Sequence, residues 1–270
     1  MREEALMLTI DKELCIHCGT CVEECSFGCL KIEDEVVKYD DRRCITCGHC
    51  LAVCPKDAIM IDGDGYDVEE VQEFQFIEST PVALVRRDIM MRRSVRSFND
   101  EPVEDSKLDL IVEAAKYAPT AKNCQKNALK VITDPDEADQ LLVDLMEQIG
   151  EIGKEKMRDN PAIAAFFLEK YREFNEEKVD GLFYGAPVII LVFSHSDIDG
   201  AICAATMGQM IEATDLGFCY VLLAAEPMNT PQMRQKYNVP DDMHCVIAMA
   251  VGHYDAEYFC SVPRKDVPLL

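Results

Sequence analysis

The second half of the chain alternates between apolar patterns of helical period and of strand type. Residues 104–117 place four apolar side chains on one helical face, and Pro119 then ends the helix. These four are Leu108, Ile111, Val112 and Ala115. Apolar runs predict strands at 129–133, 187–193, 218–223 and 245–251. Helices and strands follow one another in mixed order, which predicts an α+β fold for this part of the chain.

Other helices are predicted from their first residues. Three of them begin with a capping side chain followed by proline at the first helical position: Asp134-Pro135, Asn160-Pro161 and Thr230-Pro231. Glu137 adds a capping box to the first of them. Residues 199–216 predict a further helix, rich in small residues and followed by Gly217. These small residues suit a closely packed dimer interface, although the core of a monomer would have the same composition.

The N-terminal part follows a different pattern, which cysteine sets. The spacing C-x2-C-x2-C-x3-C occurs twice, in Cys15, Cys18, Cys21 and Cys25 and again in Cys44, Cys47, Cys50 and Cys54. Zinc is the main alternative, but structural zinc sites take two separated pairs of ligands rather than crowded quartets. Disulfides are disfavoured because nothing in the chain indicates secretion. The spacing therefore predicts two iron–sulfur clusters, with Gly19 and Gly48 in the tight loops.

Residues 1–66 resemble bacterial two-cluster ferredoxins. In those proteins the fourth cysteine of each string binds the other [4Fe–4S] cluster. The resemblance implies one cluster on Cys15, Cys18, Cys21 and Cys54, and a second on Cys44, Cys47, Cys50 and Cys25. The two halves align without a gap, so Cys29 falls opposite Ala58 and is interpreted as a packing residue. Ser26 stands where the second half has Pro55.

Length and charge limit the function classes. A chain of 270 residues has room for two domains, which we place at 1–66 and 89–270 with a linker at 67–88. The net charge of −23 argues against binding nucleic acid and suits selective docking with redox proteins. No apolar run is long enough to span a membrane, and the first ten residues do not form a signal peptide. We expect a reducing, anaerobic cytoplasm.

Arginine is concentrated directly after the linker. Five arginines fall within residues 86–96, in a chain with 27 Lys and Arg in all: Arg86, Arg87, Arg92, Arg93 and Arg96. Guanidinium groups are planar, always charged and well matched to phosphate. The segment therefore predicts an anionic ligand, and the alternative is a solvated surface run without one.

Ordered motifs over residues 89–270 resemble the FMN-dependent nitroreductase family. They are RRSVRSF at 92–98, APTAKNCQ at 118–125, GAPVII at 185–190, LGFCY at 216–220, AVGHY at 250–254 and PRK at 263–265. The resemblance implies an α+β flavin domain that forms a homodimer with two FMN sites at the subunit interface. Two positions depart from the family pattern, because Asp266 replaces a second basic residue and Lys126-Asn127 replaces Pro-Trp.

The same resemblance implies a role for each matching residue. Arg92, Ser94 and Arg96 would hold the FMN phosphate and the ribityl or pyrimidine edge, with Arg264 and Lys265 closing over the phosphate. Asn123 would bind the pyrimidine edge, and Pro119 and Thr120 would reach the ring from the partner subunit. Ala224 and Ala225 would meet the flavin near N5. The matching segments also include Arg93 and Gln125, which the resemblance likewise implies in FMN binding.

These features predict an oxidoreductase with two [4Fe–4S] clusters and FMN. A low-potential donor such as ferredoxin would deliver electrons through the clusters to FMN, which would reduce a nitroaromatic, a quinone or an activated alkene. One alternative is an NAD(P)H-driven flavin reductase in which the clusters carry electrons away, and another is a non-catalytic electron-transfer module. The insertion at 134–184 carries an aromatic stripe, read as core or dimer contact or, alternatively, as a substrate lid: Phe166, Phe167, Tyr171 and Phe174. No acid–base residue stands out.

Overall fold

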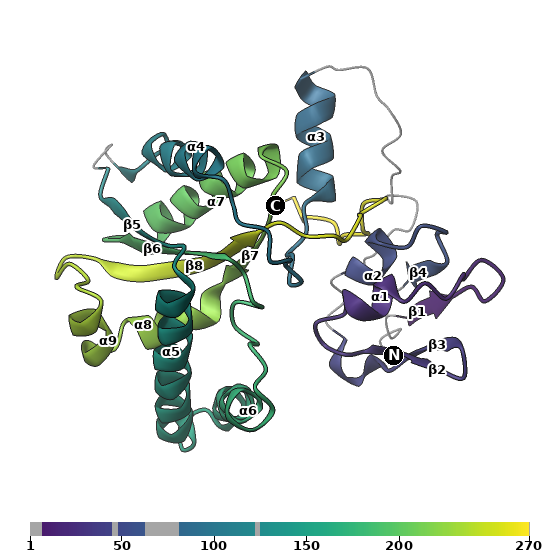
Figure 1. Cartoon of the computed structure of the whole chain (residues 1–270), viewed down its shortest axis with the longest axis horizontal. Helices are drawn as coiled ribbons and strands as arrows, with labels where there is room; N and C mark the ends of the chain where they lie inside the picture. The colour runs from purple at the N-terminus through teal and green to yellow at the C-terminus, as the bar shows by residue number, and fades with distance from the viewer. Residues whose placement is uncertain (1–6, 45–47, 63–80, 122–124, 270) are drawn as a thin grey trace. The chain divides into compact units, whose positions relative to one another are not determined.

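The chain folds into two compact units. The computed structural model describes residues 7–44, 48–62, 81–121 and 125–269 (Figure 1). Unit 1 comprises Met1–Arg93 and Asp255–Leu270, and unit 2 comprises Ser94–Tyr254. The sequence-based boundaries keep residues 255–270 with the second domain, whereas these residues pack in unit 1. Of the predicted linker at 67–88, residues 81–88 begin a helix and the rest lies outside the described residues.

Two small antiparallel sheets form the frame of unit 1. In one, β1 (Met7–Ile10) pairs with β4 (Ile59–Asp62). In the other, β2 (Leu30–Glu33) pairs with β3 (Val36–Tyr39). The first sheet joins the two ends of the cysteine-rich segment, and the second lies between the two cysteine strings.

The helices of unit 1 that lie beside the cysteine strings are short. They are α1 (Thr20–Glu23), the 3₁₀ turn η1 (Asp41–Arg43), α2 (His49–Ala52) and, further on, α3 (Pro81–Met91). Gly19 precedes α1 with φ +86°, and Gly48 precedes α2 with φ +73°. Side chains strain this left-handed backbone and glycine does not, so both loops turn tightly and bring their cysteines inward.

The core of unit 1 is shared between the cysteine-rich segment and the C-terminus. Its buried side chains include Leu8, Leu30, Leu51, Val53, Ile59 and Ile61. Cys260 and Val262, from the end of the chain, are 2% and 5% exposed and belong to the same core. The C-terminal segment is therefore a structural part of this unit.

Unit 2 is built on a four-stranded antiparallel sheet. Its strands lie in the order β5 (Asn127–Ile132), β6 (Val188–Ser194), β8 (His244–Gly252) and β7 (Gly217–Val221). All four strands were predicted within a few residues of these bounds, and the α+β fold is confirmed.

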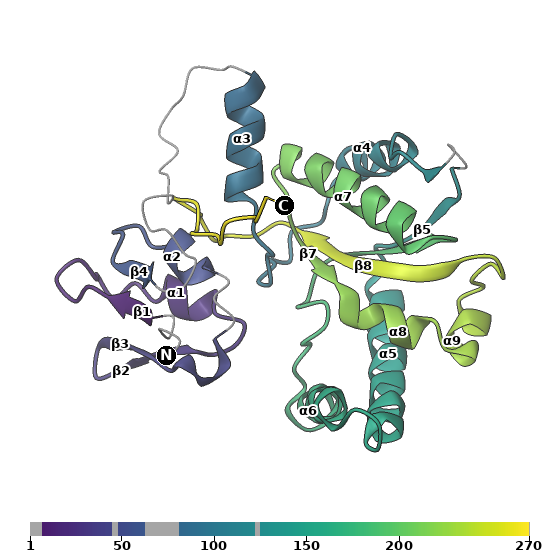
Figure 2. The same ribbon diagram turned by 180° about the vertical axis from the view of Figure 1, so that it is seen from behind.

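Helices cover both faces of this sheet (Figures 1 and 2). On one face, α4 (Asp105–Lys116) and α7 (Asp197–Ala213) pack on Val188, Ile190 and Val192 of β6. On the other face, Ile189, Leu191 and Phe193 contact the core beneath α5 (Pro135–Lys156). Burial on both faces explains why β6 is an unbroken apolar run.

The second face also carries α6 and three short helical segments. These elements are α6 (Pro161–Glu177), η4 (Leu222–Ala224), α8 (Ala225–Met228) and α9 (Pro231–Lys236). A Cβ at Gly150 of α5 would lie 2.9 Å from the Tyr171 ring, so glycine lets α6 approach closely. Phe167 is buried, and Tyr171 and Phe174 pack against the same core, whereas Phe166 is 45% exposed. Three of the four predicted stripe residues therefore serve the core.

The predicted caps are correct for two helices and wrong for the third. Asp134 Oδ1 accepts the Glu137 backbone N–H at 2.9 Å, and Asn160 caps α6 in the same way. Thr230 occupies the cap position of α9 without capping it, because its hydroxyl donates to the carbonyl of Pro227 at 3.0 Å. A threonine hydroxyl bonds equally well to a carbonyl of the preceding turn, and here that turn is α8.

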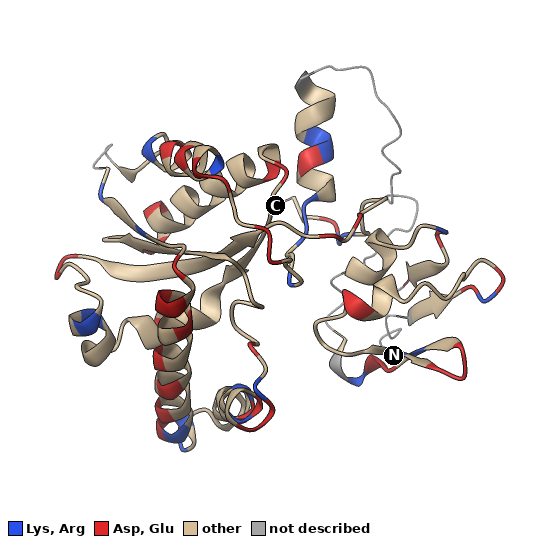
Figure 3. Ribbon diagram, viewed as in Figure 1, with Lys and Arg blue, Asp and Glu red and all other residues tan. Residues whose placement is uncertain are grey.

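Charge is unevenly spread over the units. Acidic residues recur along the length of α5 (Figure 3).

Among the described residues, no helix combines the length and the apolar character that crossing a bilayer requires.

Candidate functional site

The first cysteine cavity gathers residues from both strings. Cys15, Cys18 and Cys21 line it together with Cys54 from the second string. Burial, and then the neighbouring thiols, raise the pKa of Cys21 to about 11. Such a crowded set of thiols ionises together only when a cation compensates their charge, as iron does.

The second cavity repeats this arrangement. Cys44 and Cys50 line it with Cys25 from the first string, and Cys47 lies outside the described residues. The fourth cysteine of each string, which lies in the other string's cavity, accepts a backbone N–H from the residue four positions further on. The Cys29 N–H donates to Cys25 Sγ at 3.2 Å, and the Ala58 N–H donates to Cys54 Sγ at 3.2 Å. Such N–H···S bonds favour the thiolate that binds iron.

Cys29 is buried beside the second cysteine site. It lines the second cavity, and burial followed by the nearby Cys25 and Cys44 raises its pKa to about 12. Its counterpart in the first cavity, Ala58, carries no thiol. The alignment of the two halves showed this asymmetry, and the structure shows that Cys29 faces the second cavity.

The two cavities fit clusters better than single ions. Among the described residues, no three His, Cys, Asp or Glu side chains surround one point as ligands of a lone metal ion do. The thiols are instead distributed around the cavity walls. Cys15, Cys18 and Cys21 meet Cys54 of the other string in the first cavity, and the described Cys44 and Cys50 meet Cys25 in the second. A four-iron cube uses thiolates in this way, because each binds a different iron.

A third cavity in unit 1 is lined by arginine. It has a volume of about 380 Å³ and is bounded by Arg86, Arg92 and Arg264, together with Ile89, Met90, Ser261 and Val262. Among the described residues that line it are three guanidinium groups and no carboxylate. Arg92 and Arg264 were predicted from motifs, whereas Arg86 was recognised only as part of the arginine-rich segment. This set of donors suits a phosphate-bearing ligand.

Arg93 lies behind this cavity and is 3% exposed. Its Nη1 donates to the carbonyls of Met90 and Arg92, both at 2.8 Å, and its Nη2 donates to that of Cys260 at 3.2 Å. Burial, and then the charge of Arg264, lower the pKa of Arg93 to about 10. Its Nε has no hydrogen-bond partner within the described structure. Arg93 therefore holds the C-terminal segment against the end of α3.

Unit 2 places the rest of the arginine motif beside strand β7. The Val95 N–H donates to the Phe218 carbonyl at 2.9 Å, and Ser94 forms a parallel bridge to Phe218. The Arg96 guanidinium lies 5.8 Å from the centroid of the Tyr184 ring, within cation–π range. Sequence reasoning missed Tyr184, although it directly precedes the Gly185-Ala186-Pro187 motif.

The loop that contains Tyr184 is held by one carboxylate. Asp180 accepts the N–H groups of Leu182, Phe183 and Gly185 at 2.9, 2.8 and 2.9 Å. Tyr184 has φ +58°, a left-handed conformation that costs a non-glycine residue about 1 kcal/mol. The three hydrogen bonds offset this strain and orient the ring toward Arg96.

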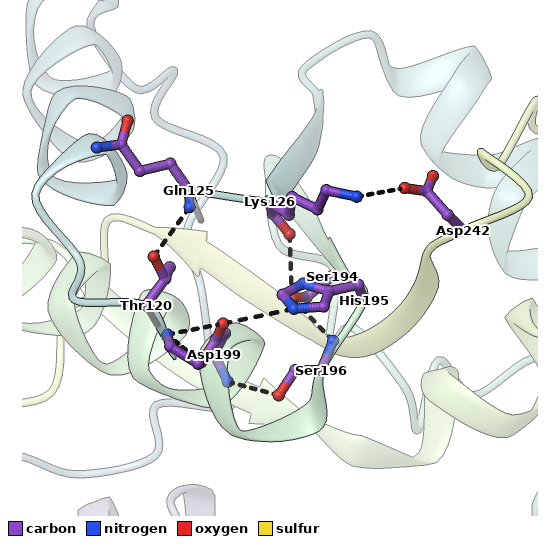
Figure 4. Close-up of polar contacts among 9 residues, drawn as sticks. Thr120, Gln125, Lys126, Ser194, His195, Ser196, Asp199 and Asp242 are labelled. Carbon is purple, nitrogen blue, oxygen red and sulfur yellow. Dashed lines mark hydrogen bonds and ion pairs between the residues drawn. The ribbon is translucent and has the colours of Figure 1, made fainter. Parts of the chain in front are cut away.

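The segment from Pro119 to Gln125 is anchored by the start of α7 (Figure 4). Asp199, only 2% exposed, accepts the Ala121 N–H with both carboxylate oxygens, at 3.1 and 3.2 Å. The Gln125 N–H donates to Thr120 Oγ1 at 2.9 Å. Pro119 is exposed and Thr120 half-buried. Predicted Asn123 lies outside the described residues.

The remaining predicted flavin residues lie at two places. Ala224 ends η4 and is fully buried, and Ala225 begins α8 and is half-buried. Lys265 follows Arg264 in unit 1 and is exposed.

A larger cavity of about 430 Å³ lies within unit 2. Apolar side chains line it together with Asp100, Asp139 and Asp180, and none of the predicted flavin residues is among its described lining residues. Its acidic lining is unsuited to the phosphate of FMN.

Comparison with known proteins matches both parts of the chain. Residues 89–253 match the nitroreductase family, and residues 14–68 match the 4Fe-4S dicluster domain. An NADPH-dependent oxidoreductase of Staphylococcus epidermidis is 27% identical over 180 residues, covering 65% of this chain and 66% of that protein. An FMN reductase (NADPH) of Bacillus subtilis is 25% identical over 170 residues, covering 61% and 64%. The chain thus spans just under two thirds of the length of these relatives.

A solved structure shows the same fold. Oxidized iodotyrosine deiodinase bound to FMN and 3-iodo-L-tyrosine superimposes with a TM-score of 0.53 at 18% identity, covering 69% of this chain and 97% of that one. Since the family match spans more than half of the residues, the chain belongs to the nitroreductase family and carries a 4Fe-4S dicluster domain in its N-terminal part.

Proposed function

We propose that this chain is an FMN-dependent oxidoreductase that receives single electrons through its cysteine-rich unit and reduces a small electrophile. When bound, the two iron–sulfur clusters supply one-electron transfer and FMN supplies hydride chemistry. Two molecules of a reduced low-potential carrier provide the two electrons, and solvent provides the protons, for each two-electron reduction. Nitroaromatics, quinones and activated alkenes are the acceptor classes.

The observation that carries the proposal is that one compact unit contains both cysteine cavities and the arginine cavity. The cysteines would hold the clusters, and Arg86, Arg92 and Arg264 would bind the FMN phosphate. Within unit 2, Asp199 holds the backbone next to Pro119 and Thr120, which the family motif implies in flavin binding. In a homodimer this loop would reach the flavin of the partner subunit.

A second candidate function is an NADPH-driven reductase in which the clusters carry electrons away. The names of the two relatives favour it, since both are described as using NADPH. The two candidates differ in what the cysteines do. In the first the cysteine cavities are needed for reduction of the flavin, and in the second they are not.

The experiment compares two donors under anaerobic conditions. Flavin bleaching is followed with a reduced ferredoxin and, separately, with NADPH, in the native chain and in Cys50→Ser. We expect the ferredoxin to bleach the flavin of the native chain and to fail with Cys50→Ser, which damages the second cysteine site. Fast bleaching by NADPH alone, unchanged in Cys50→Ser, would favour the second candidate. Reduction of the flavin by neither donor would leave the electron-transfer module as the explanation.

A further inference from the structure

The C-terminal strap, defined as residues 258–264, is attached to the helix of the second cysteine string. The Phe259 N–H donates to the Ala52 carbonyl at 2.6 Å, and Cys260 Sγ lies 3.6 Å from the Leu51 carbonyl. Both acceptors belong to α2, which also carries Cys50. The strap therefore follows any movement of this helix.

The strap also packs against Gly48, which directly precedes α2. A Cβ built on Gly48 would lie 2.4 Å from Val262 Cγ1 and 2.5 Å from Val262 Cβ. The equivalent Gly19 of the first string has a similar left-handed backbone, but its Cβ would meet Ile32 Cδ1 at 3.5 Å, an ordinary contact. The repeat thus offers two matched glycines, of which Gly48 is pressed against the strap.

The other end of the strap forms a wall of the arginine cavity. Ser261, Val262 and Arg264 all line this cavity. Arg93 fixes the strap there, since its buried guanidinium donates to the Cys260 carbonyl and to the end of α3. Val262 is the shared element, because it packs on the second cysteine loop and lines the arginine cavity at the same time.

We propose that the strap couples the second cysteine site to the arginine cavity, so that filling one strengthens binding at the other. The proposal rests on the proposed function in one respect, that the arginine cavity holds the FMN phosphate. Val262 and Arg93 are positioning residues, since they act by placing Arg264 and the loop of Gly48. Such coupling is reciprocal by thermodynamic necessity, so bound FMN must also stabilise the second site.

The first measurement compares Gly48→Ala with Gly19→Ala. Both substitutions place a side chain on a left-handed backbone, but only the first displaces Val262. FMN affinity of the flavin-free protein is measured by fluorescence, with iron content measured alongside. We expect Gly48→Ala to weaken FMN by about 5- to 150-fold, the usual range for coupled sites, and Gly19→Ala to leave it unchanged. Equal effects of the two variants, or no effect of either, would overturn the coupling.

The second measurement reads the coupling in the opposite direction. In the native protein, FMN should change the EPR spectrum or midpoint potential of the second cluster and leave the first unchanged. Val262→Ala removes the shared wall without backbone strain and should abolish this response, even if Gly48→Ala does not fold. A response of both clusters, of neither, or one that survives Val262→Ala contradicts the coupling.

A third variant separates this inference from the proposed function. Arg264→Ala should weaken FMN but not riboflavin, which lacks the phosphate. Unchanged FMN affinity in Arg264→Ala would show that the cavity does not hold the phosphate, and the proposed function of the cavity would fail. Weakened FMN in Arg264→Ala, together with equal behaviour of the two glycine variants, would remove the coupling alone.

Discussion

Replacing the arginines of the unit 1 cavity one at a time should weaken FMN according to their burial. Arg92 is half-buried and lines the cavity, so its loss removes a partly desolvated, charge-assisted hydrogen bond. Such a bond contributes about 1.5–3 kcal/mol, which corresponds to a loss of roughly 10- to 100-fold in affinity. Arg86 lines the same cavity but is exposed. Solvent screening reduces its expected contribution to about 0.2–1 kcal/mol, or less than about 6-fold.

The neighbouring Arg87 provides the matched control. It lies on the same helix α3, is exposed, and does not line the cavity. Flavin-free protein of Arg92→Ala, Arg86→Ala and Arg87→Ala would be titrated with FMN and with riboflavin, and iron would be measured in each. We expect the order of FMN losses to be Arg92, then Arg86, then Arg87, with riboflavin affinity and iron content unchanged.

Two results would refute this reasoning. Normal FMN retention in Arg92→Ala would show that the arginines form a solvated surface rather than a phosphate site. Equal weakening of FMN and riboflavin would show that Arg92 supports the fold or the flavin ring instead of the phosphate.

Three further predictions concern other sites. Cys54→Ala should empty the first cluster site and Cys25→Ala the second, so each variant should lose about four of about eight irons. Loss of the same EPR signal in both variants would contradict crossed ligation. Burial opposes ionisation of Asp144, but hydrogen bonds led by the one from Lys236 at 2.6 Å outweigh burial and lower the pKa of Asp144. The ionised carboxylate therefore stabilises the fold above the unfolded pKa of about 4, and this stabilisation is lost as the pH falls from there through the lower pKa of the folded state. Asp144→Asn should therefore reduce the free energy of unfolding by about 1–3 kcal/mol at neutral pH and flatten its acid dependence in urea titrations, whereas an unchanged acid slope would exclude this role. Asp199→Asn should speed amide hydrogen exchange at Ala121, and unchanged exchange would mean that other contacts hold this loop.

Much of the fold follows from local patterns in the sequence. The continuous apolar run of β6 predicted a strand, and the structure shows that Val188 and Ile189 face opposite cores. Asp134 and Asn160 marked helix starts, because a capping bond depends on residues three positions apart. The spacing of the two cysteine strings predicted iron–sulfur sites, since tight loops bring the first three thiols of each string together.

Only the tertiary structure decided where distant segments meet. The nitroreductase motifs assigned Arg93 and Arg264 to one ligand, yet Arg93 is buried and holds the Cys260 carbonyl, while Arg86 lines the cavity. The position of Cys29 in the second cavity also required the folded chain, because a thiol packed among other side chains and a thiol beside a cluster have the same sequence signature.

The sequence by itself determined the two cysteine strings, the family motifs and the elements of unit 2. The tertiary structure determined that residues 255–270 return to pack in unit 1. The physical reason is that periodicity and capping depend on neighbours within a few residues, whereas the contact of Val262 with Gly48 joins positions far apart in the chain. Such a contact depends on the shape of the space left by the rest of the fold, and no local pattern encodes that shape.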